Sequence, residues 1–273
     1  MLGGAELVEV SSDGELGDKA RFVRGVERAL LDGEADVGVH SAKDLPAELP
    51  EGLAIGAVPA REDAADAWIG AGDSLEGVPE GARVGTASLR RRAQLLAARP
   101  DLDVRELHGN VDTRLRKLAE AELDAIVLAV AGLRRLGREE EISFAIPADS
   151  MTPAAGQGSL VLQIRSGDEQ TAAAVASTGE ETALRELTAE RAVVSLLEAT
   201  CATPIGVRAT VTAESMSVDA FVGLPDGSEW IRDQVEGDAT EPAALGAELA
   251  QRLLATGARD LLDRAEKWSQ GRV

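Results

Sequence analysis

Three consecutive arginines stand where a helix is expected to begin. In the stretch VGTASLRRRAQLLAARP (84–100), Ser88 is a candidate N-cap. The first turn of the helix then holds Arg90, Arg91 and Arg92. The helix dipole already places partial positive charge there, so each cation is disfavoured by a few tenths of a kcal/mol, up to about 1. Either the arginines are a solvated charge run, or they converge with backbone N–H groups on an anion.

Basic residues follow other predicted strands in the same way. They are Lys43 after the strand 35–40, Arg114 after the strand 103–107, and Arg134 and Arg135 after the strand 124–130. Because the carboxyl ends of strands form the ligand crevice of an open α/β sheet, these cations are expected on one side of the molecule. The recurrence predicts a polyanionic ligand. Guanidinium forks suit carboxylates and phosphates equally, and no Walker loop favours a nucleotide.

Two further residues could take part in chemistry. Asp44 follows Lys43, and it is either a salt-bridge partner or a carboxylate that faces positive charge developing on a substrate. Cys201 is the only cysteine of the chain and lies in a Thr-rich turn after a predicted helix. A lone cysteine is usually inert and buried, and the alternative is a role in attachment or as a nucleophile.

Composition limits the classes of protein. A chain of 273 residues that is 44% hydrophobic is expected to be globular, with about two or three domains. It has no apolar run of about 18 residues and no basic N-terminal export region, which predicts a cytoplasmic protein without a membrane partner. One cysteine and two histidines exclude a zinc cluster, and no metal is expected. The net charge of −20 argues against a nucleic acid partner and, with few lysines, fits a halophilic protein.

Apolar runs alternate with amphipathic stretches through the first two-thirds of the chain. Strands are expected at 5–10, 35–40, 53–59, 83–86, 103–107 and 124–130 and at the end of a crossover loop, 152–165, and helices at 20–33, from 89, at 110–122 and at 131–137. This order predicts parallel βαβ units in an open, doubly wound sheet.

From Glu180 the pattern changes. A helix at 180–198 precedes three strands of alternating polarity, with a Pro-Asp-Gly turn at 225–227, and a closing helix at 242–265. This pattern predicts an α+β module.

Seven stretches resemble, in the same order, those of the porphobilinogen deaminase (hydroxymethylbilane synthase) family. They are VHSAKDLP, REDAADA, VGTASLRRRAQL, HGNVDTRLRKL, DAIVLAVAGLRRLG, PAAGQGSL and ERAVVSLLEATCATPIG. The resemblance runs from about residue 5 to the C-terminus, and these motifs are specific in combination. It implies two periplasmic-binding-protein-like, doubly wound α/β domains and a C-terminal α+β domain that carries the cofactor. The expected boundaries are 1–58 with 159–176 for domain 1, 64–152 for domain 2 and 181–273 for the third.

The resemblance also implies a transferase of tetrapyrrole and haem biosynthesis. Such an enzyme deaminates four porphobilinogens and joins them head to tail into hydroxymethylbilane, starting from a covalent dipyrromethane cofactor. By this resemblance Cys201 holds the cofactor through a thioether and Asp44 is the catalytic aspartate. The residues expected to bind cofactor and substrate are Lys19, Ser41, Lys43, Thr86, Ser88, Arg90, Arg91, His108, Asn110, Arg114, Arg135 and Gln157. Each pyrrole carries an acetate and a propionate, which accounts for the arginines, and a monomer is expected.

Three features depart from the family pattern. His108 stands where the family usually has arginine, so this contact would depend on pH. Ala199 and Thr200 replace the usual Gly-Gly before the cysteine. The family's N-terminal strand and helix, with an ATRxSxLA-type motif, are expected to be absent, which would expose apolar surface on the first sheet. The alternative function is a non-catalytic, two-domain protein that binds carboxylates or other polyanions, and it requires neither Asp44 nor Cys201.

Overall fold

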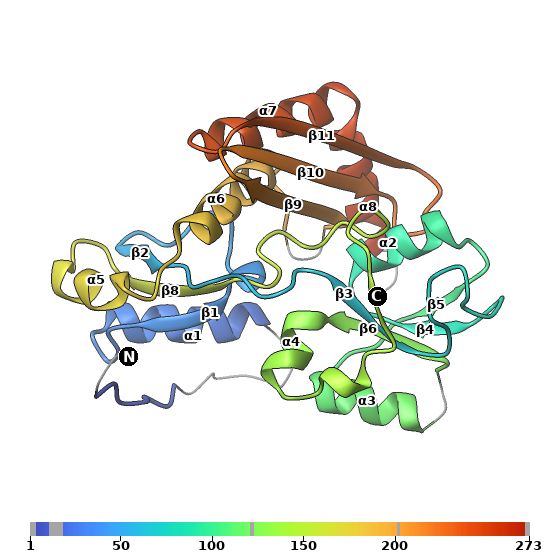
Figure 1. Cartoon of the computed structure of the whole chain (residues 1–273), viewed down its shortest axis with the longest axis horizontal. Helices are drawn as coiled ribbons and strands as arrows, with labels where there is room; N and C mark the ends of the chain where they lie inside the picture. The colour runs from blue at the N-terminus through green and yellow to red at the C-terminus, as the bar shows by residue number, and fades with distance from the viewer. Residues whose placement is uncertain (1–3, 11–18, 121–122, 201–202, 271–273) are drawn as a thin grey trace.

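Three β-sheets organise the protein (Figure 1). The computed structural model describes residues 4–10, 19–120, 123–200 and 203–270, and only the backbone of residues 19–21 and 269–270. In chain order the first sheet is left at residue 57 and re-entered at residue 160, and the second sheet lies between these points. We call residues 58–65 and 147–159 the first and second connecting segments. The third sheet follows in the last third of the chain.

The elements agree with most of the predicted helices and strands. In chain order they are α1 (Lys19–Leu31), β1 (Gly38–Ser41), the 3-10 helix η1 (Ala42–Asp44), β2 (Leu53–Ala57), β3 (Asp66–Gly70), β4 (Arg83–Gly85), α2 (Leu89–Ala98), β5 (Asp103–Arg105), α3 (Val111–Ala119), β6 (Ala125–Ala129), α4 (Val130–Arg135), η2 (Glu139–Glu141), β7 (Phe144–Ile146), β8 (Leu160–Arg165), α5 (Glu169–Ala176), α6 (Glu181–Leu196), β9 (Ile205–Thr212), β10 (Ser215–Gly223), β11 (Trp230–Asp238), α7 (Pro242–Ala255) and α8 (Ala258–Gln270). Strands β3 and β7 are additional to the prediction.

The first sheet has the order β1-β8-β2, and both strand pairs are antiparallel rather than parallel as predicted. Val161 packs with Val23 of α1, whereas Leu162 packs with Val175 of α5. Because successive strand residues face opposite sides, the two helices cover opposite faces. The strand predicted at 5–10 is wrong: these residues form no strand, and Leu7 is 99% exposed. An alternating pattern forms a strand only where a neighbouring strand supplies the hydrogen-bond ladder, and none of the described strands pairs with these residues.

The second sheet has the order β5-β4-β6-β3-β7 and is mixed. Strand β4 is parallel to β5 and β6, as predicted, but β3 is antiparallel to β6 and β7. Trp68 and Val127 pack on one face with Leu95 of α2. Ile126 packs on the other face with Leu115 of α3, and Figure 1 shows the two helices on opposite sides. This half of the protein therefore has the doubly covered sheet that the alternation predicted.

The third sheet is antiparallel, in the order β11-β10-β9, and shares one large core with α6, α7 and α8. The predicted turn at 225–227 is confirmed between β10 and β11. The single closing helix predicted at 242–265 is wrong, because the chain forms two helices there. Gly257 separates them with a φ of +101°, a conformation that interrupts a helix and that L side chains rarely adopt. No helix of the described residues is long and apolar enough to cross a membrane.

Gly246 of α7 packs against α6 without room for a side chain. A Cβ atom at this position would lie 2.2 Å from the backbone oxygen of Ala189. We predict that Gly246→Ala lowers the free energy of unfolding by about 1–3 kcal/mol through overpacking, although alanine is the better helix former. Urea denaturation measures the change. The control is Gly132→Ala in α4, where the new Cβ meets nothing within 4 Å and should not destabilise. Equal losses in both variants would contradict this packing.

Candidate functional site

Side-chain caps fix the start of two helices near the predicted crevice. The Ser88 side chain accepts a hydrogen bond from the backbone N–H of Arg91, which confirms Ser88 as the N-cap of α2. Thr86 is buried, and its hydroxyl accepts a hydrogen bond from the backbone N–H of Ser88 at 3.1 Å. Asn110 caps α3 by accepting from the N–H of Thr113 at 2.9 Å. The polar residues of both turns therefore set where each helix begins.

Arg90 and Arg91 lie inside the protein and share one carboxylate. They are 4% and 5% exposed, and Asp66, the first residue of β3, is 0% exposed. Arg90 donates to both carboxylate oxygens of Asp66, at 2.6 and 3.1 Å. Arg91 Nε donates to Oδ1 of Asp66 at 2.9 Å. The anion that the arginine run predicted is thus supplied in part by the chain itself, from a residue that the sequence did not single out.

Neutral groups complete the surroundings of this carboxylate. Gln157 donates to Asp66 at 3.0 Å and to the backbone oxygen of Ala64 at 2.7 Å. Burial by itself would raise the pKa of the Asp66 carboxyl, but the charges of Arg90 and Arg91 outweigh burial and hold that pKa well below its usual range. Gln157 is 1% exposed, and its amide nitrogen is bonded to protein groups. Its predicted role as a ligand-binding residue therefore stays a prediction.

The buried arginine cluster carries more positive than negative charge. Two guanidinium groups face one carboxylate, and no second carboxylate of the described residues pairs with Arg90 or Arg91. The buried Nε of Arg90 has no hydrogen-bond partner within that part of the chain. Burial lowers the pKa of Arg91 and of Arg114, and the charge of Arg114 lowers that of Arg91 further. The cluster therefore has an excess of positive charge, which an anionic ligand would compensate.

A small cavity of about 50 Å³ lies beside Ser41, Lys43 and Arg135. Arg135 donates to the backbone oxygen of Gly158 at 2.7 Å, across this cavity's lining. Gly158 has a φ of +89°, and a Cβ there would lie 2.2 Å from a backbone oxygen, so only glycine fits. Ligand pockets usually measure about 300–1,000 Å³. A ligand of ordinary size therefore enters only if these side chains move.

The other predicted site residues differ in burial and in whether the structure describes them. Asp44 ends η1, next to Lys43, and is partly buried. His108 is exposed and pairs with Glu106 at 2.7 Å. The side chain of Lys19 and the whole of Cys201 lie outside the described residues. The structure thus brings Ser41, Lys43 and Arg135 to one cavity, and the positions of the Lys19 and Cys201 side chains stay predictions.

The residues before the cysteine need no glycine in this structure. Ala199 and Thr200, which replace the expected Gly-Gly, are not in the left-handed region, whereas Glu198 has a φ of 51°. The backbone N–H of Thr200 donates to the Thr203 hydroxyl at 2.8 Å. The substitution therefore introduces no left-handed strain at positions 199 and 200.

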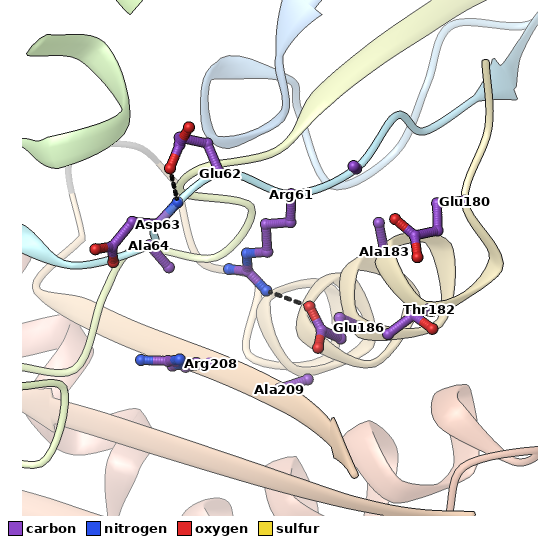
Figure 2. Close-up of a pocket in the computed structure, with 11 residues that line it drawn as sticks. Arg61, Glu62, Asp63, Ala64, Glu180, Thr182, Ala183, Glu186, Arg208 and Ala209 are labelled. Carbon is purple, nitrogen blue, oxygen red and sulfur yellow. Dashed lines mark hydrogen bonds and ion pairs between the residues drawn. The ribbon is translucent and has the colours of Figure 1, made fainter. Parts of the chain in front are cut away.

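A larger cavity of about 320 Å³ lies elsewhere, between the first connecting segment, α6 and β9 (Figure 2). None of the predicted site residues lines it. Its lining includes four acidic residues: Glu62, Asp63, Glu180 and Glu186. These carboxylates disfavour a polyanion, so this cavity is a poorer candidate for the predicted ligand than the arginine cluster. No group of three or more His, Cys, Asp or Glu side chains that could hold a metal ion occurs among the described residues.

Next to that cavity, Glu190 of α6 joins three parts of the chain. Its carboxylate is 0% exposed and accepts from Arg61 of the first connecting segment at 2.7 Å. It also accepts from the backbone N–H of Gly156, at 2.6 Å, and of Ala209 in β9, at 2.8 Å. Figure 2 shows Arg61 reaching from the connecting segment toward α6, where it also meets Glu186. Sequence reasoning missed this buried pair, whose two members lie 129 positions apart.

Comparison with known proteins identifies the family. The profile described as "Porphobilinogen deaminase, dipyromethane cofactor binding domain" matches residues 8–173. The profile described as "Porphobilinogen deaminase, C-terminal domain" matches residues 184–255. The chain belongs to the porphobilinogen deaminase family. The first profile spans the first two sheets, with the arginines of α2 and Asp44 of η1. The second profile begins in α6 and ends in α7.

Curated porphobilinogen deaminases are similar over most of the chain. The protein of Campylobacter concisus is 44% identical over 256 residues, which are 93% of this chain and 82% of that protein. The protein of Pelotomaculum thermopropionicum is 46% identical over 254 residues, or 93% and 81% of the two chains. These matches support the enzyme and not the non-catalytic alternative.

Solved structures show only a distant likeness. A TRAP periplasmic solute binding protein from Desulfovibrio salexigens is 11% identical with a TM-score of 0.38, over 59% of each chain. A YaeC family lipoprotein from Enterococcus faecalis is 14% identical with a TM-score of 0.37, over 56% of this chain and 74% of that one. The fold class follows from the three sheets and the helices that cover them.

The depressed pKa of Asp66 predicts how stability responds to acid. A carboxyl whose folded-state pKa is lowered stabilises the fold above its unfolded pKa and loses this effect as the pH falls through the folded value. Wild type should therefore exceed Asp66→Asn in unfolding free energy by about 3–5 kcal/mol near neutral pH. The difference should shrink below about pH 4. Urea denaturation at several pH values measures it, and a constant difference between about pH 5 and pH 2 would contradict the ion pairs.

Proposed function

We propose that this member of the porphobilinogen deaminase family holds the carboxylates of its growing pyrrole chain with the basic residues of the crevice. Family membership fixes the enzyme class and the dipyrromethane cofactor. The observation that supports the residue roles is the uncompensated positive charge of the buried cluster around Arg90 and Arg91. A dry site with excess positive charge favours an anionic ligand more strongly than a solvated one does.

The basic residues divide into two groups by their surroundings. In the first group, Arg90 and Arg91 are buried and Arg114 is partly buried. Arg114 lies close enough for its charge to lower the pKa of Arg91. Lys43 and Arg135 line the small cavity. We assign these five residues to the acetate and propionate groups. Ser41, Thr86, Ser88, Asn110, His108, Gln157 and Lys19 are proposed to assist them.

Asp44 is proposed to be the catalytic carboxylate. In η1 it directly follows Lys43, which lines the small cavity. When ammonia leaves porphobilinogen, positive charge develops on the pyrrole. A fixed carboxylate stabilises that charge without reorganisation of solvent. The neighbouring basic residues hold the substrate's carboxylates, so that the pyrrole ring is presented to Asp44.

Cys201 is proposed to hold the cofactor through a thioether. The dipyrromethane, when bound, supplies the free pyrrole carbon to which the first porphobilinogen is joined. Cys201 is the only cysteine in the sequence, so no other thiol can take this role. A thiolate is the nucleophile that such an attachment needs.

We further propose the arrangement in which the enzyme works. Domain 1 comprises 1–58 and 159–176, domain 2 comprises 64–152, and the third comprises 181–273. The chain acts as a cytoplasmic monomer without a nucleic acid or membrane partner. Its net charge of −20 supports the exclusion of nucleic acid and suits high salt, where screening weakens self-repulsion.

Replacing Asp44 by asparagine should separate chemistry from binding. We predict that purified Asp44→Asn keeps its cofactor and its fold but loses about 10²–10³-fold in turnover, because the developing charge has no counter-charge. Steady-state kinetics with porphobilinogen measure turnover, and intact mass measures the cofactor. Asp263→Asn, at an exposed position of α8, is the matched control and should behave as wild type. Wild-type turnover in Asp44→Asn would return Asp44 to an ion-pair role.

Replacing Cys201 by serine tests the attachment. We predict that active enzyme has an intact mass above the sequence value by two pyrrole units, that Cys201→Ser lacks the increment, and that it makes no tetrapyrrole. Mass spectrometry and product assay measure these outcomes. An increment retained in Cys201→Ser, or activity at the unmodified mass, would refute the assignment.

A further inference from the structure

Asp66 is bonded on both of its oxygens, and its donors come from two parts of the chain. Oδ2 accepts from Arg90 Nη1 at 2.6 Å. Oδ1 accepts from Arg90 Nη2 at 3.1 Å, Arg91 Nε at 2.9 Å and the side chain of Gln157 at 3.0 Å. The arginines belong to α2, whereas Gln157 belongs to the second connecting segment. A guanidinium is planar, so two bonds to one carboxylate fix the plane and rotation of the Arg90 fork.

One guanidinium nitrogen of Arg90 is not bonded to Asp66. Arg90 Nε is buried and has no partner within the described part of the chain. The two side chains also donate to backbone oxygens, Arg90 to that of Thr152 and Arg91 to that of Val127. Asp66 therefore satisfies part of each guanidinium and fixes where both positive charges and the unpaired Nε of Arg90 lie.

Asp66 is also close to the crevice in the sheet. It pairs in register with Ala129 of β6, and Ala129 lines the small cavity together with Lys43 and Arg135. Gln157 lies between Gly156 and Gly158, which line the same cavity. Asp66 thus lies between the arginines of α2 and the lining of the small cavity, to which Lys43 and Arg135 belong.

We propose that Asp66 is a positioning residue for carboxylate binding, which it performs by holding Arg90 and Arg91 in a single orientation. The inference rests on the proposed function, because it takes these arginines as ligands of the pyrrole carboxylates. Asp66 itself repels those carboxylates and does not bind them. Its effect is to reduce the reorganisation that the arginines would otherwise need when the ligand arrives.

A second buried ion pair in the same protein separates this role from simple stabilisation. Glu190 is equally buried and binds Arg61, but there two carboxylates, Glu190 and Glu186, face one guanidinium. That pair has no excess positive charge to offer a ligand. Around Asp66 the balance is reversed, with two guanidinium groups on one carboxylate. The two carboxylates are therefore matched in burial, and they differ in whether excess positive charge remains around them.

The test compares Asp66→Asn and Asp66→Glu with Glu190→Gln as the control, all as cofactor-loaded enzymes. We expect Asp66→Asn to lower kcat/KM for porphobilinogen about a hundredfold, chiefly through KM, because misplaced binding groups lose that much. Asp66→Glu keeps the charge and displaces it by one methylene, so we expect a KM about tenfold above wild type. Glu190→Gln should lower the melting temperature and leave KM unchanged. A merely structural role for Asp66 would move the melting temperature of its variants and not KM.

Each result decides for or against the proposal. A raised KM in both Asp66 variants, with none in Glu190→Gln, supports it, and a wild-type KM in Asp66→Glu overturns it. If Asp66→Asn does not fold, the KM of Asp66→Glu alone decides. A raised KM in Glu190→Gln would also overturn it, since any buried carboxylate would then have the effect. Arg91→Lys separates failure of the proposed function from failure of the positioning role. A wild-type KM in Arg91→Lys refutes the proposed role of the arginines. A raised KM in Arg91→Lys together with a wild-type KM in Asp66→Glu refutes only the positioning role of Asp66.

Discussion

The burial of carboxylates that bind separate parts of the chain is the constraint on which this structure depends. Glu190 is fully buried and is bonded by Arg61, by the backbone N–H of Gly156 and by that of Ala209. These partners belong to the first connecting segment, the second connecting segment and the third sheet. A buried charge that loses its partners is strongly destabilising, so each of the three parts must stay in register with the others. Shape complementarity alone would tolerate small shifts that this carboxylate does not.

The second connecting segment links this junction to the proposed binding site. Gln157 accepts a bond from Arg61 Nε on its backbone oxygen, at 3.0 Å, and its side chain donates to Asp66. The segment that meets Glu190 is therefore the one that meets the carboxylate between Arg90 and Arg91. Strand β9, which follows the cysteine in sequence, is bonded to the same Glu190. The arginines and strand β9 are thus both connected to the second connecting segment, the arginines through Asp66 and β9 through Glu190.

Local signals made part of this arrangement predictable. The caps Ser88 and Asn110 could be inferred because a polar side chain before an amphipathic run acts on its own next turn. Asp66 could not, because it meets its partners across 24 and 91 positions, which no periodicity reports. Its one signal is a charge that opens an otherwise apolar run, DAWIG. The expected strand at 5–10 failed for a related reason, since alternation indicates a strand but not whether a neighbouring strand exists. The break at Gly257 was hidden because the apolar spacing continues through it.

A strongly acidic protein that binds a polyanion is electrostatically consistent once burial is considered. The net charge of −20 repels an anionic chain at long range, but salt shortens that range to about 10 Å at 0.1 M and about 3 Å at 1 M. Charges inside the protein are screened much less, so the attraction of Arg90 and Arg91 persists where the surface repulsion fades. The acidic surface and the buried arginine cluster therefore act at different distances. The first affects how copies of the protein interact, and the second would act on a carboxylate in the proposed site.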